Sequence, residues 1–156
     1  MQNLFPSLET LHLVQCDQIA MLWSRECPTS IFQNLKDIDI YNCKGLQGLG
    51  PPSMFAALVH LHELKIKSCP QIRDVITKET AEDVIRERII VFPQLKTLKL
   101  SDLYNLESFY KGSCKLKFPN LKQLVVSTLS RMSKFVESEI SNALFDEKVQ
   151  FYSILP

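Results

Sequence analysis

The chain has 156 residues, 46% of them hydrophobic, and its 18 basic and 17 acidic residues leave a net charge of +1 at pH 7. That balance excludes a general electrostatic attraction to nucleic acid or to an anionic membrane. No apolar run reaches the roughly 18 residues that a membrane span needs, and the first residues lack the basic start and apolar stretch of a secretory signal, so we expect a cytoplasmic protein without nucleic-acid or membrane partners.

An apolar pattern recurs five times along the chain, at offsets 0, 3, 6, 8, 11, 14 and 17 from a starting Phe or Leu. The copies start at Phe5, Phe32, Leu58, Phe92 and Phe118, with spacings of 27, 26, 34 and 26 residues. Every patterned position is apolar in all five copies. Self-similarity at such a period indicates stacked repeats in place of one central core. The pattern predicts a curved leucine-rich-repeat solenoid over residues 1–135, an α/β-type array of about five repeats.

Within each copy, offsets 5 to 9 alternate between polar and apolar residues, as residues 37–41 and 97–101 illustrate. A period of two predicts a short strand with one buried face. Stacking the copies places these strands in one parallel sheet, while the remaining apolar offsets fill the coil behind it. We expect offsets 5, 7, 9 and 10 to face solvent on the concave side and the convex segments to be mostly irregular or short helices.

These solvent-facing columns supply the candidate protein-binding residues. Tyr41 is the expected anchor, because an amphipathic aromatic side chain offers a large contact area at little entropy cost. Asp37 and Glu63 should lie on adjacent strands about 5 Å apart, where Lys65 or an external cation would compensate their repulsion. The alternative is that such positions are polar merely because they face water. The full set on the concave face is Asp37, Asp39, Tyr41, Glu63, Lys65, Lys67, Lys99 and Asp102.

Three of the five cysteines occupy the same offset in successive copies. Cys16, Cys43 and Cys69 occupy this offset in the first three copies, and leucine replaces them in the last two, which indicates a small apolar side chain filling a core position. Burial raises the pKa of a thiol and suppresses its reactivity. Cys27 and Cys114 fall outside the pattern, and we expect no disulfides.

An insertion at residues 77–90 accounts for the long spacing between the third and fourth copies. The segment is rich in charge and contains neither Gly nor Pro. We expect a solvated loop on the outside of the coil. A short helix with Glu82 and Arg86 paired at i, i+4 is the alternative.

The pattern stops after residue 135. A sixth copy starting at Leu144 would place Glu147 and Gln150 at core offsets. Residues 136–156 are therefore expected to form an irregular tail, and the helical spacing of Val136, Ile140 and Leu144 suggests a cap on the last coil.

No constellation of residues points to catalysis, a metal or a cofactor. His62 precedes Glu63, but the second histidine of a His-Glu-x-x-His motif is absent. The turn at residues 45–50 is rich in glycine, but no Lys-Ser/Thr follows as in a phosphate-binding loop. We expect a binding module and not an enzyme.

The amino-acid sequences of the repeats closely resemble those of one family. The copies begin Phe5-Pro-Ser-Leu, Phe92-Pro-Gln-Leu and Phe118-Pro-Asn-Leu, and middle copies continue Tyr41-Asn-Cys-Lys-Gly-Leu and Ser68-Cys-Pro-Gln-Ile. Residues 4 to about 135 resemble the C-terminal repeats of plant intracellular disease-resistance proteins, the coiled-coil, nucleotide-binding, leucine-rich-repeat receptors. The resemblance implies a module that recognises pathogen effectors or host proteins that they modify, and that restrains the receptor's nucleotide-binding domain by packing on it.

Other classes remain open at this point. Leucine-rich-repeat substrate receptors of ubiquitin ligases also contain Cys-Pro pairs like Cys69-Pro70, although they lack the Phe-Pro starts. The Gly-x-Ile-Pro signature of extracellular receptor repeats is missing. The first copy begins almost at residue 1 without a capping segment, which suggests a fragment of a longer protein or a non-signalling truncated remnant.

Overall fold

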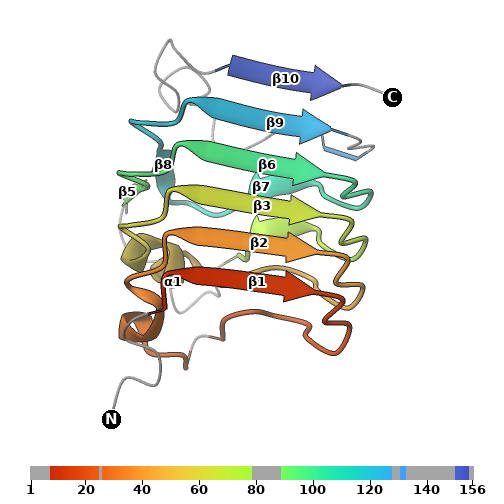
Figure 1. The fold of residues 1–156 in the computed structure, drawn as a ribbon, viewed down its shortest axis with the longest axis horizontal. Coiled ribbons are helices and arrows are strands. Elements are labelled where there is room, and N and C mark those ends of the chain that lie inside the picture. The colour runs from red at the N-terminus through yellow and green to blue at the C-terminus, as the bar shows by residue number, and fades with distance from the viewer. Residues whose placement is uncertain (1–7, 25, 79–88, 128–130, 133–149, 155–156) are drawn as a thin grey trace.

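The main feature of the computed structural model is a parallel sheet of six strands (Figure 1). The structure describes residues 8–24, 26–78, 89–127, 131–132 and 150–154. The strand order of the sheet is β1-β2-β3-β6-β9-β10. The strands are β1 (Thr10–Val14), β2 (Asp37–Tyr41), β3 (Glu63–Lys67), β6 (Thr97–Ser101), β9 (Gln123–Ser127) and β10 (Gln150–Ile154). The first five strands each begin five residues after the start of a sequence copy. The predicted leucine-rich-repeat solenoid is therefore confirmed.

The apolar pattern forms the interior of this solenoid. In the three middle copies every patterned position is buried except Phe32, which is half-buried. Register explains why, since Ile38, Leu64 and Leu98 lie directly opposite one another on β2, β3 and β6. In the first copy the described patterned residues are only half-buried, because β1 is the outermost strand of the sheet.

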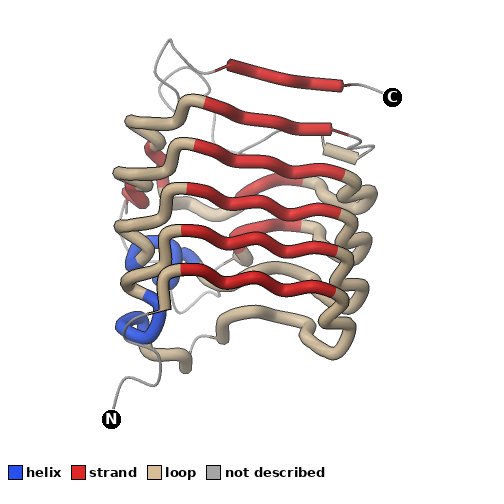
Figure 2. Tube along the Cα trace, in the orientation of Figure 1, coloured by secondary structure: helices blue, strands red, loops and turns tan. Residues whose placement is uncertain are grey.

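Behind the main sheet, short strands and short helices complete each coil (Figures 1 and 2). β4 (Asp74–Ile76) pairs with β7 (Ser108–Tyr110), and β5 (Ile89–Val91) pairs with β8 (Lys115–Lys117), both in parallel. The helical segments are a 3₁₀ turn, η1 (Thr29–Phe32), and α1 (Pro52–Ala57). The two small sheets go beyond the irregular or short helical segments expected there. Strands of three residues are too short for alternation to reveal them in the sequence.

Aromatic rings run through the core from coil to coil. Trp23 meets Phe55 edge-on with ring centroids 5.6 Å apart, and Phe55 lies 6.1 Å from Phe92. Phe92 in turn stacks on Phe118 at 4.8 Å. Such pairs each add about 0.5–1.5 kcal/mol beyond the burial of their area. This column ties neighbouring repeats together, none of which could bury its apolar side chains alone.

The residue after each of the first four long strands adopts a left-handed backbone conformation. Gln15, Asn42, Ser68 and Asp102 have φ angles between 53° and 57°, although none is glycine. The left-handed region costs a non-glycine residue roughly 1–2 kcal/mol. Hydrogen bonds between coils offset that cost, because the amide of Asn42 donates to the carbonyl of Lys67 at 3.0 Å and the amide of Ser68 donates to that of Ser101 at 3.1 Å.

The C-terminal segment differs from its prediction. β10 pairs with β9 so that Gln150 lies opposite Gln123, which gives it the same place in the repeat as the other long strands. The expectation of an irregular tail was therefore wrong for residues 150–154. A copy starting at Leu144 would put Gln150 at offset 6 of the repeat. The pairing with β9 puts Gln150 at offset 5, so the start assumed from the sequence was one residue too early. The expected cap over residues 136–149 lies outside the described residues.

The insertion is described only at its ends. Thr77 and Lys78 follow β4, and the final residues, 89–90, belong to β5 and pair with β8. The choice between a loop and a Glu82–Arg86 helix falls on residues 79–88, outside the described part of the chain.

Candidate protein-binding face

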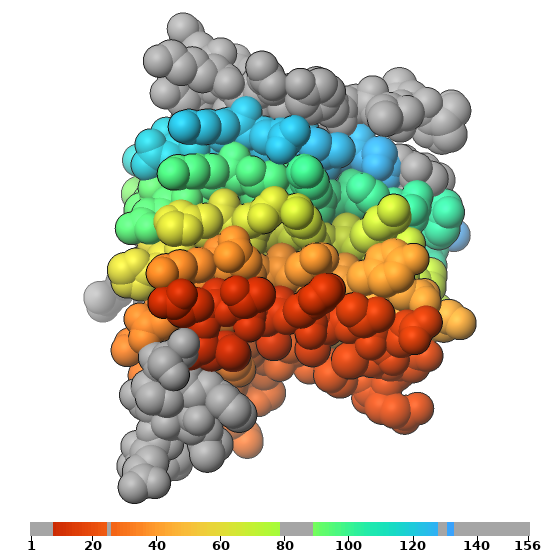
Figure 3. All heavy atoms as spheres, viewed as in Figure 1, coloured from red at the N-terminus to blue at the C-terminus, as the bar shows by residue number. Residues whose placement is uncertain are grey.

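The exposed side of β1, β2, β3, β6 and β9, hereafter the sheet face, carries seven of the eight candidate residues. It is the side predicted to be concave. The side chains alternate as expected, so that Asp37 and Asp39 are half-buried and Tyr41 is exposed, while Ile38 and Ile40 between them are buried. In Figure 3 the strands form continuous parallel rows across the molecule. The sheet thus brings residues that are 26 to 34 positions apart in sequence into direct cross-strand contact.

An acidic cluster surrounds Lys65 near the middle of the sheet face. Asp37 lies opposite Glu63, and Asp39 lies opposite Lys65, which confirms the expected pairing of two carboxylates on adjacent strands. The Lys65 ammonium donates to Glu63 Oε1 at 2.9 Å. This hydrogen bond, together with the charges of Glu63, Asp39 and Asp37, raises the pKa of Lys65. Lys65 therefore compensates the carboxylates only in part, and this cluster of one lysine and three carboxylates keeps a net negative charge.

His12 extends this network to the first strand. It lies opposite Asp39, with 3.7 Å between its Nε2 and Asp39 Oδ2. His12 is exposed and Asp39 is half-buried, and contacts of this kind near the surface contribute only about 0–1 kcal/mol. The pair adds a polar border to the acidic cluster.

Two other lysines on the sheet face are not neutralised. Lys67 is exposed and Lys99 is half-buried, and within the described part of the chain neither lies within ion-pair distance of a carboxylate. Lys67 lies between Tyr41 on β2 and Ser101 on β6. The three candidate lysines therefore differ, because Lys65 is paired with Glu63 whereas Lys67 and Lys99 could each bind an anionic group of a ligand.

An apolar patch adjoins Lys67. The side chain of Tyr41 is 42% exposed, and Val14, directly opposite on β1, is 47% exposed. Large apolar side chains this open on a strand are suited to contact with another molecule. Val14 was absent from the candidate residues, although its position in the same column as Tyr41 and Lys67 is visible in the sequence.

Asp102 occupies a different place from the other candidates. It lies one residue beyond β6 in the left-handed turn, and its carboxylate accepts a hydrogen bond from the Ser68 hydroxyl at 3.5 Å. Asp102 therefore supports the turn between neighbouring coils at the border of the sheet face, outside the strands themselves.

The aligned cysteines lie beneath the ends of these strands. All five cysteines carry free thiols, and Cys43 and Cys69 are buried while Cys16 is half-buried. Burial raises the pKa of Cys69 to about 11 and also raises that of Cys43. The Cys69 thiol lies 3.4 Å from the Lys67 carbonyl, which accepts from it. These thiols fill core positions and are poorly suited to act as nucleophiles at neutral pH.

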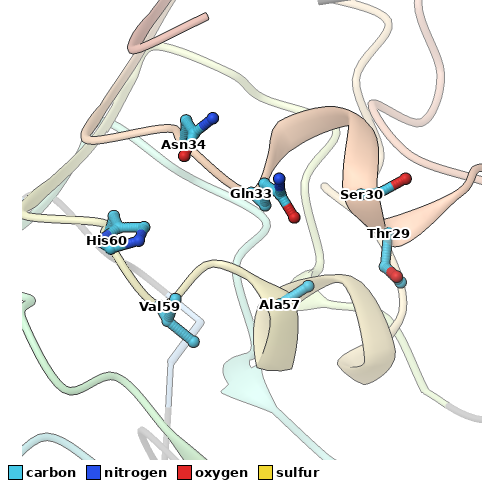
Figure 4. A pocket seen from close by; sticks show the side chains of 7 residues that line it. All are labelled: Thr29, Ser30, Gln33, Asn34, Ala57, Val59 and His60. Carbon is cyan, nitrogen blue, oxygen red and sulfur yellow. The ribbon is translucent and has the colours of Figure 1, made fainter. Parts of the chain in front are cut away.

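A separate hollow of about 470 Å³ lies between η1 and α1 (Figure 4). Thr29, Ser30 and Gln33 line one side, and Val59 and His60 line the other. Across the described ranges, no group of three His, Cys, Asp or Glu side chains is arranged to hold a metal ion. The hollow offers hydroxyl and amide groups without a charged cluster, so the sheet face is the better candidate for recognition.

Comparison with known proteins gives the family of the chain. Residues 7–146 match the family described as plant disease resistance protein RPS2-like, leucine-rich repeats. A probable disease resistance protein of Arabidopsis thaliana is 31% identical over 149 residues, which cover 90% of this chain and 15% of that relative. No solved structure matches. None of the helices in the described ranges is long and apolar enough to cross a membrane. The chain belongs to the leucine-rich-repeat family of RPS2-like plant disease resistance proteins, as its repeats predicted.

Proposed function

We propose that this chain is the protein-recognition part of an intracellular plant immune receptor and that it binds a protein ligand through the sheet face. The observation that carries the proposal is the exposed pair Tyr41 and Val14 beside the unneutralised Lys67. Tyrosine is one of the residue types enriched in interface hot spots, which makes Tyr41 the expected anchor. Family membership supports a role in defence and favours this function over that of a ubiquitin-ligase substrate receptor.

The ligand is a pathogen effector or a host protein that an effector modifies. The chain spans 15% of the length of its Arabidopsis relative, which leaves room in such a protein for other domains. A second contact of the repeat region, with the receptor's own nucleotide-binding domain, would restrain signalling until the ligand binds.

The dimensions of the sheet face limit how the ligand can bind. Five strands spaced by about 4.8 Å, each with five residues rising about 3.3 Å, cover about 24 by 17 Å, or roughly 400 Å² in projection. A standard interface buries about 800 Å² on each partner. A ligand that buries such an accessible area therefore follows the corrugated side-chain surface of these strands or also contacts residues beyond them.

A photo-crosslinking experiment tests the proposal. A photoreactive phenylalanine analogue would replace Tyr41 on the sheet face or, as a matched control, Tyr104, which lies in the turn after β6 and is 51% exposed. Both proteins would be expressed in leaf tissue and irradiated before and after pathogen challenge. We expect a discrete adduct from position 41 that is absent from position 104.

The same sites should separate in a functional assay. Tyr41→Ala should reduce the defence response of the receptor, measured as cell death, whereas Tyr104→Ala should leave it intact. Loss of the response in Tyr104→Ala alone, with adducts formed only at position 104, would place recognition outside the sheet face.

A further inference from the structure

The charges on the sheet face do not cancel evenly. Lys65 is engaged by Glu63, with Asp37 and Asp39 close enough to affect its charge. Lys67 and Lys99 remain without a carboxylate partner among the described residues. Lys65 therefore compensates part of the negative charge of the carboxylates around it. Lys67 on β3 and Lys99 on β6 add positive charge that no carboxylate among the described residues balances.

The two available lysines are placed to act on one anion. Lys99 lies opposite Lys65, and Lys67 lies opposite Ser101, so Lys67 and Lys99 are diagonal neighbours on adjacent strands. With a strand spacing of about 4.8 Å and two residues of about 3.3 Å along the strand, their Cα atoms are about 8 Å apart. A lysine stem is long and flexible, so both ammonium groups can reach a single carboxylate placed between them. The Ser101 side chain on the same face offers a hydroxyl donor nearby.

The apolar patch of Tyr41 and Val14 indicates that the ligand carries an apolar side chain near its carboxylate. Tyr41 is one strand from Lys67, and Val14 is one strand further. With the carboxylate midway between Lys67 and Lys99, an apolar side chain over Tyr41 would lie about 8 Å from it, and one over Val14 about 12 Å. In an extended segment, residues i and i+2 are about 7 Å apart and point to the same side. One extended segment that crosses the strands can satisfy both subsites.

The acidic cluster gives this segment a preferred position. Asp37 and Glu63 lie at the start of their strands, and Asp39 lies in the same row as Lys65 and Lys99 but two strands away from Lys99. These carboxylates would repel an acidic side chain from β2 and from the start of β3. The carboxylate of the segment is therefore directed toward Lys67 and Lys99.

We propose that the sheet face binds an extended, acidic segment of a partner protein, with an Asp or Glu between Lys67 and Lys99 and an apolar side chain two residues away against Tyr41 and Val14. This inference rests on the proposed function, because it assigns a ligand chemistry to the same surface.

Selection from a library tests this inference without knowledge of the natural ligand. A display library of random decapeptides would be selected on the immobilised 156-residue chain, and in parallel on a Lys67→Glu/Lys99→Glu variant. The control variant, Lys115→Glu/Lys117→Glu, makes the same charge change on β8, outside the main sheet. Circular dichroism would verify that all three proteins are folded.

We expect peptides selected on the unaltered chain to be enriched in Asp or Glu with an apolar residue two positions away. Their affinity should fall at least tenfold in the Lys67→Glu/Lys99→Glu variant and in Tyr41→Ala, and should weaken as salt is raised from 50 to 500 mM. The Lys115→Glu/Lys117→Glu control should bind them as the unaltered chain does, and a Lys67→Arg/Lys99→Arg variant should retain the acidic preference.

The contrary outcomes separate the two proposals. Peptides that need Tyr41 but show no acidic excess would overturn the acidic segment and leave the sheet face as the recognition surface. Peptides that bind all variants equally would overturn both. Selection that enriches nothing would overturn the acidic segment, since a library of this length contains the predicted pattern many times.

Discussion

Replacing Leu64 by alanine tests the repeat register most directly. Leu64 is fully buried on β3, between Ile38 and Leu98 on the neighbouring strands. The change removes three carbon atoms, a transfer loss of about 2.4 kcal/mol at about 0.8 kcal/mol each. Because strands on both sides hold the site open, a cavity term adds to this loss, and the free energy of unfolding should fall by about 3–4 kcal/mol.

Leu11 provides a matched control, because it has the same repeat position on β1 but is only half-buried. Leu11→Ala should reduce the free energy of unfolding by about 1–2 kcal/mol, since the described sheet packs against it from one side only. Urea unfolding followed by circular dichroism, with fluorescence of the single tryptophan, Trp23, as a second probe, would measure both values. An equal or larger loss in Leu11→Ala would refute the assignment of Leu64 to the closed centre of the solenoid.

Four further predictions concern the thiols, a close contact and a strained turn. Burial raises the pKa of Cys69 to about 11, above the value near 9 of an unfolded cysteine. The neutral thiol therefore stabilises the fold below pH 9, and this contribution is lost as pH rises through 11, so Cys69→Ala should show a smaller drop in the free energy of unfolding over that range. With a thiol reagent at pH 8, half-buried Cys16 should react before Cys69, as mass spectrometry of partly labelled protein would show. Gly45→Ala would place a Cβ 2.2 Å from the Asp17 carbonyl oxygen, and should destabilise the chain by about 2–3 kcal/mol in a urea titration. Gln15→Gly should instead stabilise it by about 1 kcal/mol, because φ of 55° suits glycine; a rise in the urea midpoint would register this.

Periodicity in the sequence predicted the long strands and the core because burial imposes the same requirement on every copy. Leu64 and Leu98 lie opposite one another on neighbouring coils, so an apolar residue at one position supports the placement of the other in the core. The same logic failed for β10. Hydrogen bonds to β9 involve the backbone and do not depend on an apolar side chain at each offset, so a strand can form where the sequence pattern is broken.

Two local features also escaped prediction for a common reason. The left-handed turns carry Gln, Asn, Ser and Asp in place of glycine. Asn and Asp favour this conformation but Gln and Ser do not, so this position gave no consistent signal across the copies. Lys65, Lys67 and Lys99 looked equivalent as members of solvent-facing columns. Only the side-chain positions in the structure show that Lys65 forms an ion pair with Glu63, whereas Lys67 and Lys99 have no carboxylate partner among the described residues.

The third and fourth copies start 34 residues apart, whereas the second and third start 26 apart, yet β3 pairs with β6 in the same register as β2 with β3. Extra length between β4 and β5 is therefore absorbed without shifting the sheet. Insertions and deletions can accumulate at that point while point substitutions independently alter the residues of the sheet face.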